Sequence, residues 1–475
     1  MFMSDCAFLK YSKHAIIIIC CALLFSSPVG VLLAQNEQAQ NEQAQDKQVP
    51  SKQAKNKQAP KTTSVDTSAK KLNKKTVITH YLALGKAIFE QALEKGEEFH
   101  TAIDTFLAQP STVSHRALKT SYRLARAAYQ QSEVFRFSNP EVDDIEGRVN
   151  AWPVDEGLMD YVESAHYGRN HTFAQANIIG QKTMQAAGKN WDFSKINPAL
   201  LRSLHEIGDE EANVATGFHA IEFLIWGQDL NGYKPGAGMR RYTDYLVDAK
   251  ACTGGNCSRR RAYLKSAAQL LIEDLKAMNQ LFSQPNSPLI KRINSQDDTT
   301  SIEGIIQGLA SLSYGELAGE RMQLGLLLND PEEEHDCFSD LTHVAHYNNM
   351  VGIQTIYSGQ FTSLDGKTKL RGASLSQLIL QEDPALFKTL SGLMDNAYKN
   401  IRALYDKAES GTPYDSMLDP KNKPHQKFIT DSIASLKALT TGWNKLSKVM
   451  GIRHLEVEGS DSLDDPKKVL SPQKS

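Results

Sequence analysis

The chain has 475 residues, a formal net charge of −2 and a sequence pI of about 6.7. This balance, without a basic stripe, argues against nucleic-acid binding. Beyond the N-terminal segment, no apolar run reaches the roughly 20 residues that a membrane-spanning helix needs. The roughly 400 residues that follow the N-terminal segments suffice for two or three domains.

Residues 1–34 have the features of a secretory signal. Lys10 and Lys13 precede an apolar run over 15–25, and Leu32-Leu33-Ala34 offers a cleavage site. The run is too short to favour a spanning helix. We therefore expect an exported protein of the periplasm or the outer cell envelope.

Residues 35–73 are expected to form a disordered linker. Five copies of a pentapeptide begin at Gln35: QNEQA, QNEQA, QDKQV, PSKQA and KNKQA. They contain no aromatic and hardly any aliphatic residue, so they cannot bury a core.

The cysteines indicate one disulfide. Three of the six lie in the signal-like segment, which leaves Cys252, Cys257 and Cys337. In an oxidising compartment, Cys252 and Cys257 predict a small disulfide loop around two glycines. A zinc clip would need further Cys or His nearby in the sequence, and there are none. Cys337 is expected to be buried or unpaired.

The rest of the chain has a helical pattern, with no β alternation longer than a few residues. Apolar residues recur at helical spacing over 81–107, 111–135, 198–227, 258–282, 301–328, 333–358, 384–406 and 425–449. Long helices joined by short loops predict an all-α fold of two antiparallel helical-bundle halves. We place the halves at 74–285 and 299–455, separated by the polar stretch 285–298 and followed by a disordered tail at 456–475.

The segment 217–227 contains His219 and Glu222 in an otherwise apolar run. The two residues are three apart, so both side chains project from one helix face. An all-round apolar helix is buried, and a carboxylate there must be paired, metal-bound or protonated. Either the histidine is a core residue bonded to its own glutamate, or the pair belongs to a metal or ligand site. Small residues Gly208 and Ala215 on the same predicted helix would leave space beside it.

A second polar segment runs from Arg148 to Glu156. Pro153 disfavours helix at Trp152, so an ordered loop is predicted, and such loops often line sites. In a ligand site, Arg148 can hold an anionic group bidentately, with Trp152 and Asp155 beside it. The alternative is structural: Trp152 closes a bundle end and Arg148 pairs with Asp155.

Three segments together resemble the imelysin family, also classed as the M75 peptidases, and especially its iron-regulated branch. They are GFHAIE at 217–222, FRFSNP with EGRVNAWPVDEG between 135 and 157, and GELAGERM with EHDCFSDLTH between 315 and 343. The resemblance extends from about residue 75 to 450. It implies an all-helical fold of two bundle-like halves with a site between them, export, and a metal role for His219 and Glu222.

Completing ligands are expected from facing helices, because bundles build metal sites in this way. Candidates for this role are Glu316, Asp340 and His343, with Glu320 and His335 as further options; each of these has a structural alternative, such as a Glu320–Arg321 salt bridge. Mixed nitrogen and oxygen ligands suit a divalent or ferric ion, with iron first, zinc as the alternative, and copper also compatible.

A metallopeptidase of known motif needs H-E-x-x-H or H-x-x-E-H. Asp209 and Phe223 stand where the second histidine would be. Three hypotheses remain. The first is an exported metal-binding protein in iron acquisition, passing metal to an inner- or outer-membrane uptake partner. The second is an M75-type metallopeptidase acting on extracytoplasmic proteins. The third is a metal-free envelope module that binds a peptide or small anionic ligand.

Overall fold

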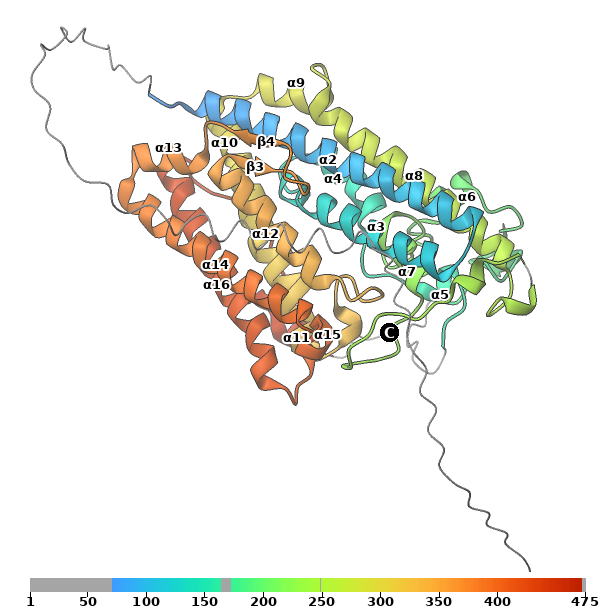
Figure 1. Cartoon of the computed structure of the whole chain (residues 1–475). Helices are drawn as coiled ribbons and strands as arrows, with labels where there is room; N and C mark the ends of the chain where they lie inside the picture. Colours follow the sequence, from blue (N-terminus) through green and yellow to red (C-terminus); the bar gives the residue numbers. More distant parts are fainter. Residues whose placement is uncertain (1–70, 164–171, 248, 472–475) are drawn as a thin grey trace, which may run out of the picture. The chain divides into compact units, whose positions relative to one another are not determined.

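Helices α2 (Lys74–Ala108) and α8 (Cys257–Ser283) lie side by side, and α3 (Thr112–Gln130) packs against α2 (Figure 1). The computed structural model describes residues 71–163, 172–247 and 249–471. α2 begins where the Asn73 side chain accepts the N–H of Thr76, a typical N-cap. Its buried face packs on α8 through the stacked rings of Phe89 and Phe282, whose centroids are 4.9 Å apart.

The second half of the chain forms another set of packed helices. α14 (Pro384–Glu409) packs against both α16 (Lys423–Val449) and α12 (Thr342–Ser358). α10 (Asp298–Ser311) continues into a π-helical segment, η4 (Leu312–Gln323), and then into α11 (Leu324–Leu328). α12 also packs against α3, so it contacts both sets. The division into two helical-bundle halves at 74–285 and 299–455 stays a prediction.

Shorter elements connect these helices. Two antiparallel hairpins pair β1 (Thr183–Ala186) with β2 (Lys189–Asp192) and β3 (Gln360–Thr362) with β4 (Lys369–Arg371). The predicted all-α class is confirmed, since the described residues add no larger sheet. The remaining elements are α4 (Pro140–Val149), α5 (Glu156–Met159), α6 (Pro198–Leu204), α7 (Gly217–Trp226), α9 (Pro288–Ser295), α13 (Leu375–Glu382), α15 (Tyr414–Leu418), α17 (Asp461–Asp464), α18 (Pro466–Leu470), η1 (Glu133–Phe135), η2 (Tyr242–Tyr245), η3 (Ala249–Ala251) and η5 (Pro331–Glu333).

Two predicted helices are interrupted. The stretch 198–227 contains α6 and α7 with a loop between them, because Glu206, Gly208 and Asp209 adopt left-handed backbone conformations that end a helix. Gly208 and Ala215 therefore do not extend the face of α7. The stretch 333–358 is helical only from Thr342, and the loop before it has left-handed backbone at Asp340.

The described residues include most of the C-terminal tail but little of the N-terminal segments. The signal-like residues 1–34 and most of the repeat linker 35–73 lie outside the described residues. The tail expected to be disordered from residue 456 is ordered to Ser471. Ser460 caps α17 there, and the Ser462 hydroxyl donates to the carbonyl of Gly319 at 3.0 Å.

The predicted Cys252–Cys257 disulfide is confirmed, and Cys337 is a buried free thiol. No described helix is long and apolar enough to cross a membrane.

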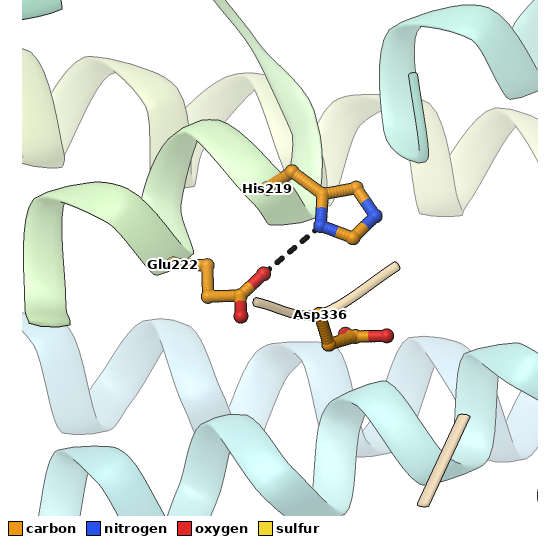
Figure 2. A group of neighbouring side chains, drawn as sticks. All are labelled: His219, Glu222 and Asp336. Carbon is orange, nitrogen blue, oxygen red and sulfur yellow. Dashed lines mark hydrogen bonds and ion pairs between the residues drawn. The ribbon is translucent and has the colours of Figure 1, made fainter. Parts of the chain in front are cut away.

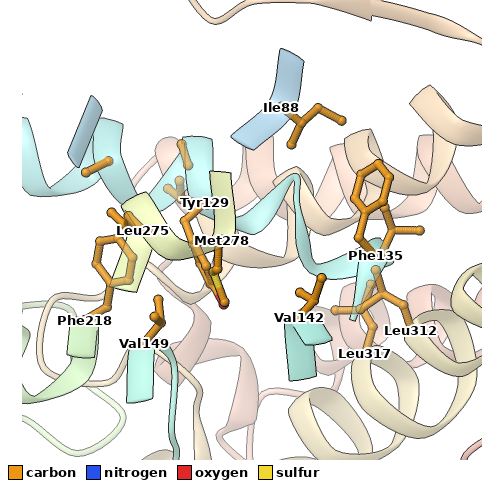
Figure 3. Packing of buried hydrophobic residues seen from close by; sticks show 14 of the residues in the cluster. Ile88, Tyr129, Phe135, Val142, Val149, Phe218, Leu275, Met278, Leu312 and Leu317 are labelled. Carbon is orange, nitrogen blue, oxygen red and sulfur yellow. The ribbon is translucent and has the colours of Figure 1, made fainter. Parts of the chain in front are cut away.

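α7 lies in the buried core of the protein (Figure 3). Phe218 of α7 lies near Leu275 of α8 in this core, and its ring centroid is 5.2 Å from that of Tyr129 on α3. All ten residues of α7 are buried, as the apolar run predicted. The polar side chains of α7 therefore face other protein groups rather than water.

Candidate functional site

Gly217 lets α7 begin directly against the end of α4. Its backbone is left-handed, with φ of +85°, and an added Cβ would lie 2.6 Å from the Val149 carbonyl oxygen. Only glycine avoids both the strain and the clash. The glycine of the 217–222 motif thus fixes where His219 and Glu222 point.

His219 and Glu222 form a buried pair (Figure 2). His219 Nδ1 lies 2.9 Å from Glu222 Oε2, and the two residues are 1% and 0% exposed. The hydroxyl of Tyr122 on α3 donates to the same oxygen at 3.2 Å. The backbone N and the Oγ of Ser339 lie 3.0 and 2.6 Å from Glu222 Oε1. Both carboxyl oxygens are therefore engaged by protein groups.

Arg126 of α3 lies at the centre of the cluster. Its Nη2 is 2.9 Å from His219 Nε2, and its Nε donates to Asp336 Oδ1 at 2.5 Å. It also donates to Asn150 Oδ1. A guanidinium has no acceptor, so His219 Nε2 must accept, and the imidazole proton sits on Nδ1 facing Glu222. His219 is therefore neutral.

The electrostatics agree with this proton assignment. Burial and the nearby Arg126 charge lower the pKa of His219 well below its usual value. Burial and the Asp336 charge raise the pKa of Glu222 well above its usual range. Burial alone would raise the pKa of Asp336, but Arg126 and His335 hold it well below its usual range. One guanidinium and one carboxylate thus leave the cluster without net charge.

His335 connects the cluster to a pocket. Its ring centroid is 4.8 Å from that of His219 and 5.7 Å from that of Trp152. A pocket of about 630 Å³ is lined by Trp152, His335 and Cys337 among others. The acidic residues of the lining are Glu156, Asp229, Asp330, Glu332 and Glu333, and no Lys or Arg is among its lining residues. The pocket therefore favours positively charged ligands.

The three predicted ligand-binding residues of the 148–156 segment lie in different places. Trp152 lines the pocket, in the predicted loop between α4 and α5. Arg148 ends α4 and pairs with Asp274 of α8 at 3.3 Å. Asp155 is buried at the start of α5, where its N–H donates to the Ala212 carbonyl at 2.7 Å.

The predicted completing ligands are also dispersed. Glu316 pairs with Arg321 at 2.5 Å and with Arg136 at 3.5 Å. His343 Nε2 lies 2.6 Å from Glu409 Oε1. Asp340 is grouped with Asp229 and Asp415 rather than with His219.

Sequence reasoning missed Arg126 and Asp336 as members of the cluster. Asp336 stands within the third family-like segment, next to His335, so its position was a usable signal. Arg126 stands among Ala125, Ala127 and Ala128 on one turn of α3. A charged residue surrounded by small apolar ones indicates a buried charge with a partner. No sequence pattern identified that partner.

The cluster meets part of what a metal requires. Ligand atoms of His219, Glu222 and Asp336 lie within 4.8 Å of one another, and this mixture suits iron or zinc. The Arg126 guanidinium, however, contacts His219 Nε2 and Asp336 Oδ1. The donor types fit a metal ion, whereas in this structure Arg126 engages two of the three residues.

Comparison with known proteins identifies the relatives. The model of the family described as Imelysin, Peptidase M75, matches residues 85–442. A putative iron-regulated protein A precursor from Parabacteroides distasonis ATCC 8503 is 16% identical, with a TM-score of 0.56, over 81% of this chain and 97% of that one. An imelysin-like protein from Psychrobacter arcticum 273-4 is 12% identical, with a TM-score of 0.46, over 81% and 98%. No curated protein matches the chain.

Proposed function

Because the chain belongs to the imelysin family, whose model covers residues 85–442, we propose that it is an exported protein that binds and passes on a metal ion in iron acquisition. The observation that carries the proposal is the acidic pocket that reaches His335 beside the His219 cluster. The name of the similar Parabacteroides protein, a putative iron-regulated protein A precursor, makes iron the first metal to test.

Export is supported by two features. The signal-like segment 1–34 precedes the repeat linker. The Cys252–Cys257 disulfide suits an oxidising compartment, because disulfides persist there and are rare in the cytosol. We therefore assign the protein to the periplasm or outer envelope, where it would hand metal to a membrane uptake partner.

On metal capture, the metal ion would replace the Arg126 guanidinium as the cation that contacts the cluster. The carboxylates of the pocket attract the metal cargo, and His219, Glu222 and Asp336 supply its ligands. Arg126 gives up its contacts with His219 and Asp336, and Glu222 releases the proton that its raised pKa retains. Because the Arg126 guanidinium competes with the metal for these ligands, it weakens metal binding. Weaker binding suits a carrier that must release its metal.

The two other hypotheses have less support. A catalytic zinc needs ligands held open to water and a separate base. Here His219 Nε2 is engaged by Arg126, and His335 comes from a loop rather than from one turn along α7. A small anionic ligand would meet the five acidic residues of the pocket lining.

Metal binding tests the proposal directly. Fe²⁺, Fe³⁺ and Zn²⁺ are titrated into the chain lacking residues 1–34, beside His219→Ala and Glu222→Gln, with His425→Ala on α16 as the matched control. We expect stoichiometric binding by the wild type and the control and loss in both site variants. A casein protease assay on the same samples separates a carrier from an enzyme. Equal metal content in all four proteins would refute the assignment of the site.

A further inference from the structure

A second group of acidic side chains involves none of the His219 cluster. Ligand atoms of Asp229, Asp340 and Asp415 lie within 4.8 Å of one another. The three residues come from the loop after α7, the loop before α12, and α15. Segments from both halves of the chain therefore bring their carboxylates to one place.

Two oxygens of this group have no hydrogen-bond donor among the described residues. Asp415 is 1% exposed and its Oδ2 is unpartnered there, as is Oδ1 of Asp340. Glu334, outside the group, is also 1% exposed, and burial and the charges of Asp415 and Asp340 raise its pKa well above its usual value. A buried carboxylate oxygen without a donor is unfavourable unless a cation binds it.

This group differs from the His219 cluster in having no positive charge of its own. None of the described Lys, Arg or His side chains forms an ion pair with these three carboxylates, whereas Arg126 pairs with Asp336 in the other cluster. The pKa of Asp340 is raised to about 7 and that of Asp415 to about 8. Burial is the larger cause, and repulsion from the neighbouring carboxylates adds to it. Such repulsion is relieved when a cation binds.

We propose that Asp229, Asp340 and Asp415 bind a Ca²⁺ ion. All three donors are carboxylate oxygens, which suit hard cations rather than the softer transition metals. Ca²⁺–oxygen distances are about 2.4 Å, so opposite ligands lie about 4.8 Å apart, a span that this group accommodates. The ligand set shares no residue with His219, Glu222 and Asp336, although Asp229 also lines the acidic pocket.

The bound ion would position the loop that builds the other cluster. Asp340 directly follows residues 335–339, and this short segment supplies His335, Asp336 and Ser339. Anchoring the end of the segment to an ion restricts how it can move. The Ca²⁺ site would thus hold Asp336 against Arg126 and Ser339 against Glu222 without touching the cargo.

Calorimetric titration of Ca²⁺ tests the site, using chain lacking residues 1–34 from which metal has been stripped. We expect one site of sub-millimolar affinity in the wild type, as in extracellular modules, and weaker binding of Mg²⁺. Asp415→Asn is expected to weaken Ca²⁺ binding by about tenfold or more. Asp419→Asn, the same change just after α15, should leave it unaltered.

His219→Ala is expected to keep full Ca²⁺ binding, so failure of the cargo proposal and failure of this one are distinguishable. Asp415→Asn should also lose the rise in melting temperature that Ca²⁺ gives the wild type.

Hydrogen exchange provides the second measurement. Ca²⁺ should slow exchange of the amides of 334–341 in the wild type and not in Asp415→Asn. No Ca²⁺ binding by the wild type at about 1 mM, or equal binding by Asp415→Asn, would overturn the proposal.

Discussion

Arg126 Nη2 lies 2.9 Å from His219 Nε2, so the imidazole lone pair that a metal would use is already engaged by a cation of the chain. The other imidazole nitrogen donates to Glu222 Oε2 at 2.9 Å. Both ring nitrogens of His219 are therefore engaged by protein groups, and a metal must displace one of them.

Arg126→Gln is expected to lower stability and strengthen metal binding. Removing one partner of a buried ion pair costs about 3–5 kcal/mol, because Asp336 is left without its guanidinium. The same change frees His219 Nε2, so Zn²⁺ or Fe²⁺ should bind more tightly than in the wild type and restore part of the stability. Urea unfolding with and without metal measures both effects.

The control for this variant is Arg402→Gln. Arg402 pairs with Asp406 at 2.8 Å on the exposed side of α14, where such pairs contribute little. We expect a change within about 0.5 kcal/mol and unaltered metal affinity. A metal affinity of Arg126→Gln equal to that of the wild type would show that Arg126 and the metal do not compete.

His346 is expected to make the protein less stable in acid. It is fully buried, neither ring nitrogen has a hydrogen-bond partner among the described residues, and burial lowers its pKa to about 3. Unfolded histidine titrates near about 6.5, so below that pH the unfolded state binds more protons and stability falls as pH falls. This one residue should account for about 2 kcal/mol of loss between pH 7 and pH 5.

His346→Leu tests that effect. Urea unfolding at pH 7 and pH 5 should show a stability loss smaller than that of the wild type by about 2 kcal/mol, whatever the offset at pH 7. His425→Leu, on α16, is the control and should keep the wild-type pH dependence. Identical slopes in all three proteins would contradict the expectation.

Gly217→Ala is expected to disturb the site through the backbone. The new Cβ would meet the carbonyl oxygens of Val149 and Arg148 at 2.6 and 2.8 Å. Gly188→Ala is the matched control, because Gly188 has a φ of +71° but no atom within 4 Å of an added Cβ. Both variants share the cost of left-handed alanine, so their difference isolates the clash.

We expect Gly217→Ala to be less stable than Gly188→Ala by about 1–3 kcal/mol, as for other overpacked sites. Only Gly217→Ala should also weaken metal binding, since it displaces the start of α7. Thermal melting and metal titration report these two effects separately. Equal stability of the two variants would show that α4 and α7 shift to accommodate the new Cβ without a loss of stability.

The sequence predicted the long helices well and the site only in part. Apolar spacing located α2, α8, α14 and α16 because their packing follows one helical period. It missed the break between α6 and α7, where Gly208 and two non-glycine residues adopt left-handed conformations that no period reveals.

For the site, spacing correctly suggested that His219 and Glu222 share a face, and their hydrogen bond follows from that. Arg126 lies 93 residues before His219 and Asp336 lies 210 residues after Arg126. Contacts of such separation depend on how helices pack, so one sequence could not supply them. Glu316 and His343 were proposed by residue type, and each has another partner.

The π-helical segment η4 places a constraint on the length of the chain. Residues five apart lie about 140° apart around an α-helix, whereas i→i+5 bonding brings them toward one face. Glu316 and Arg321 are five apart in η4 and pair at 2.5 Å. Deleting one residue between them would restore α-helical winding and shift every later side chain of the segment around the axis. The Glu316–Arg321 pair therefore depends on the number of residues between the two as well as on their identity.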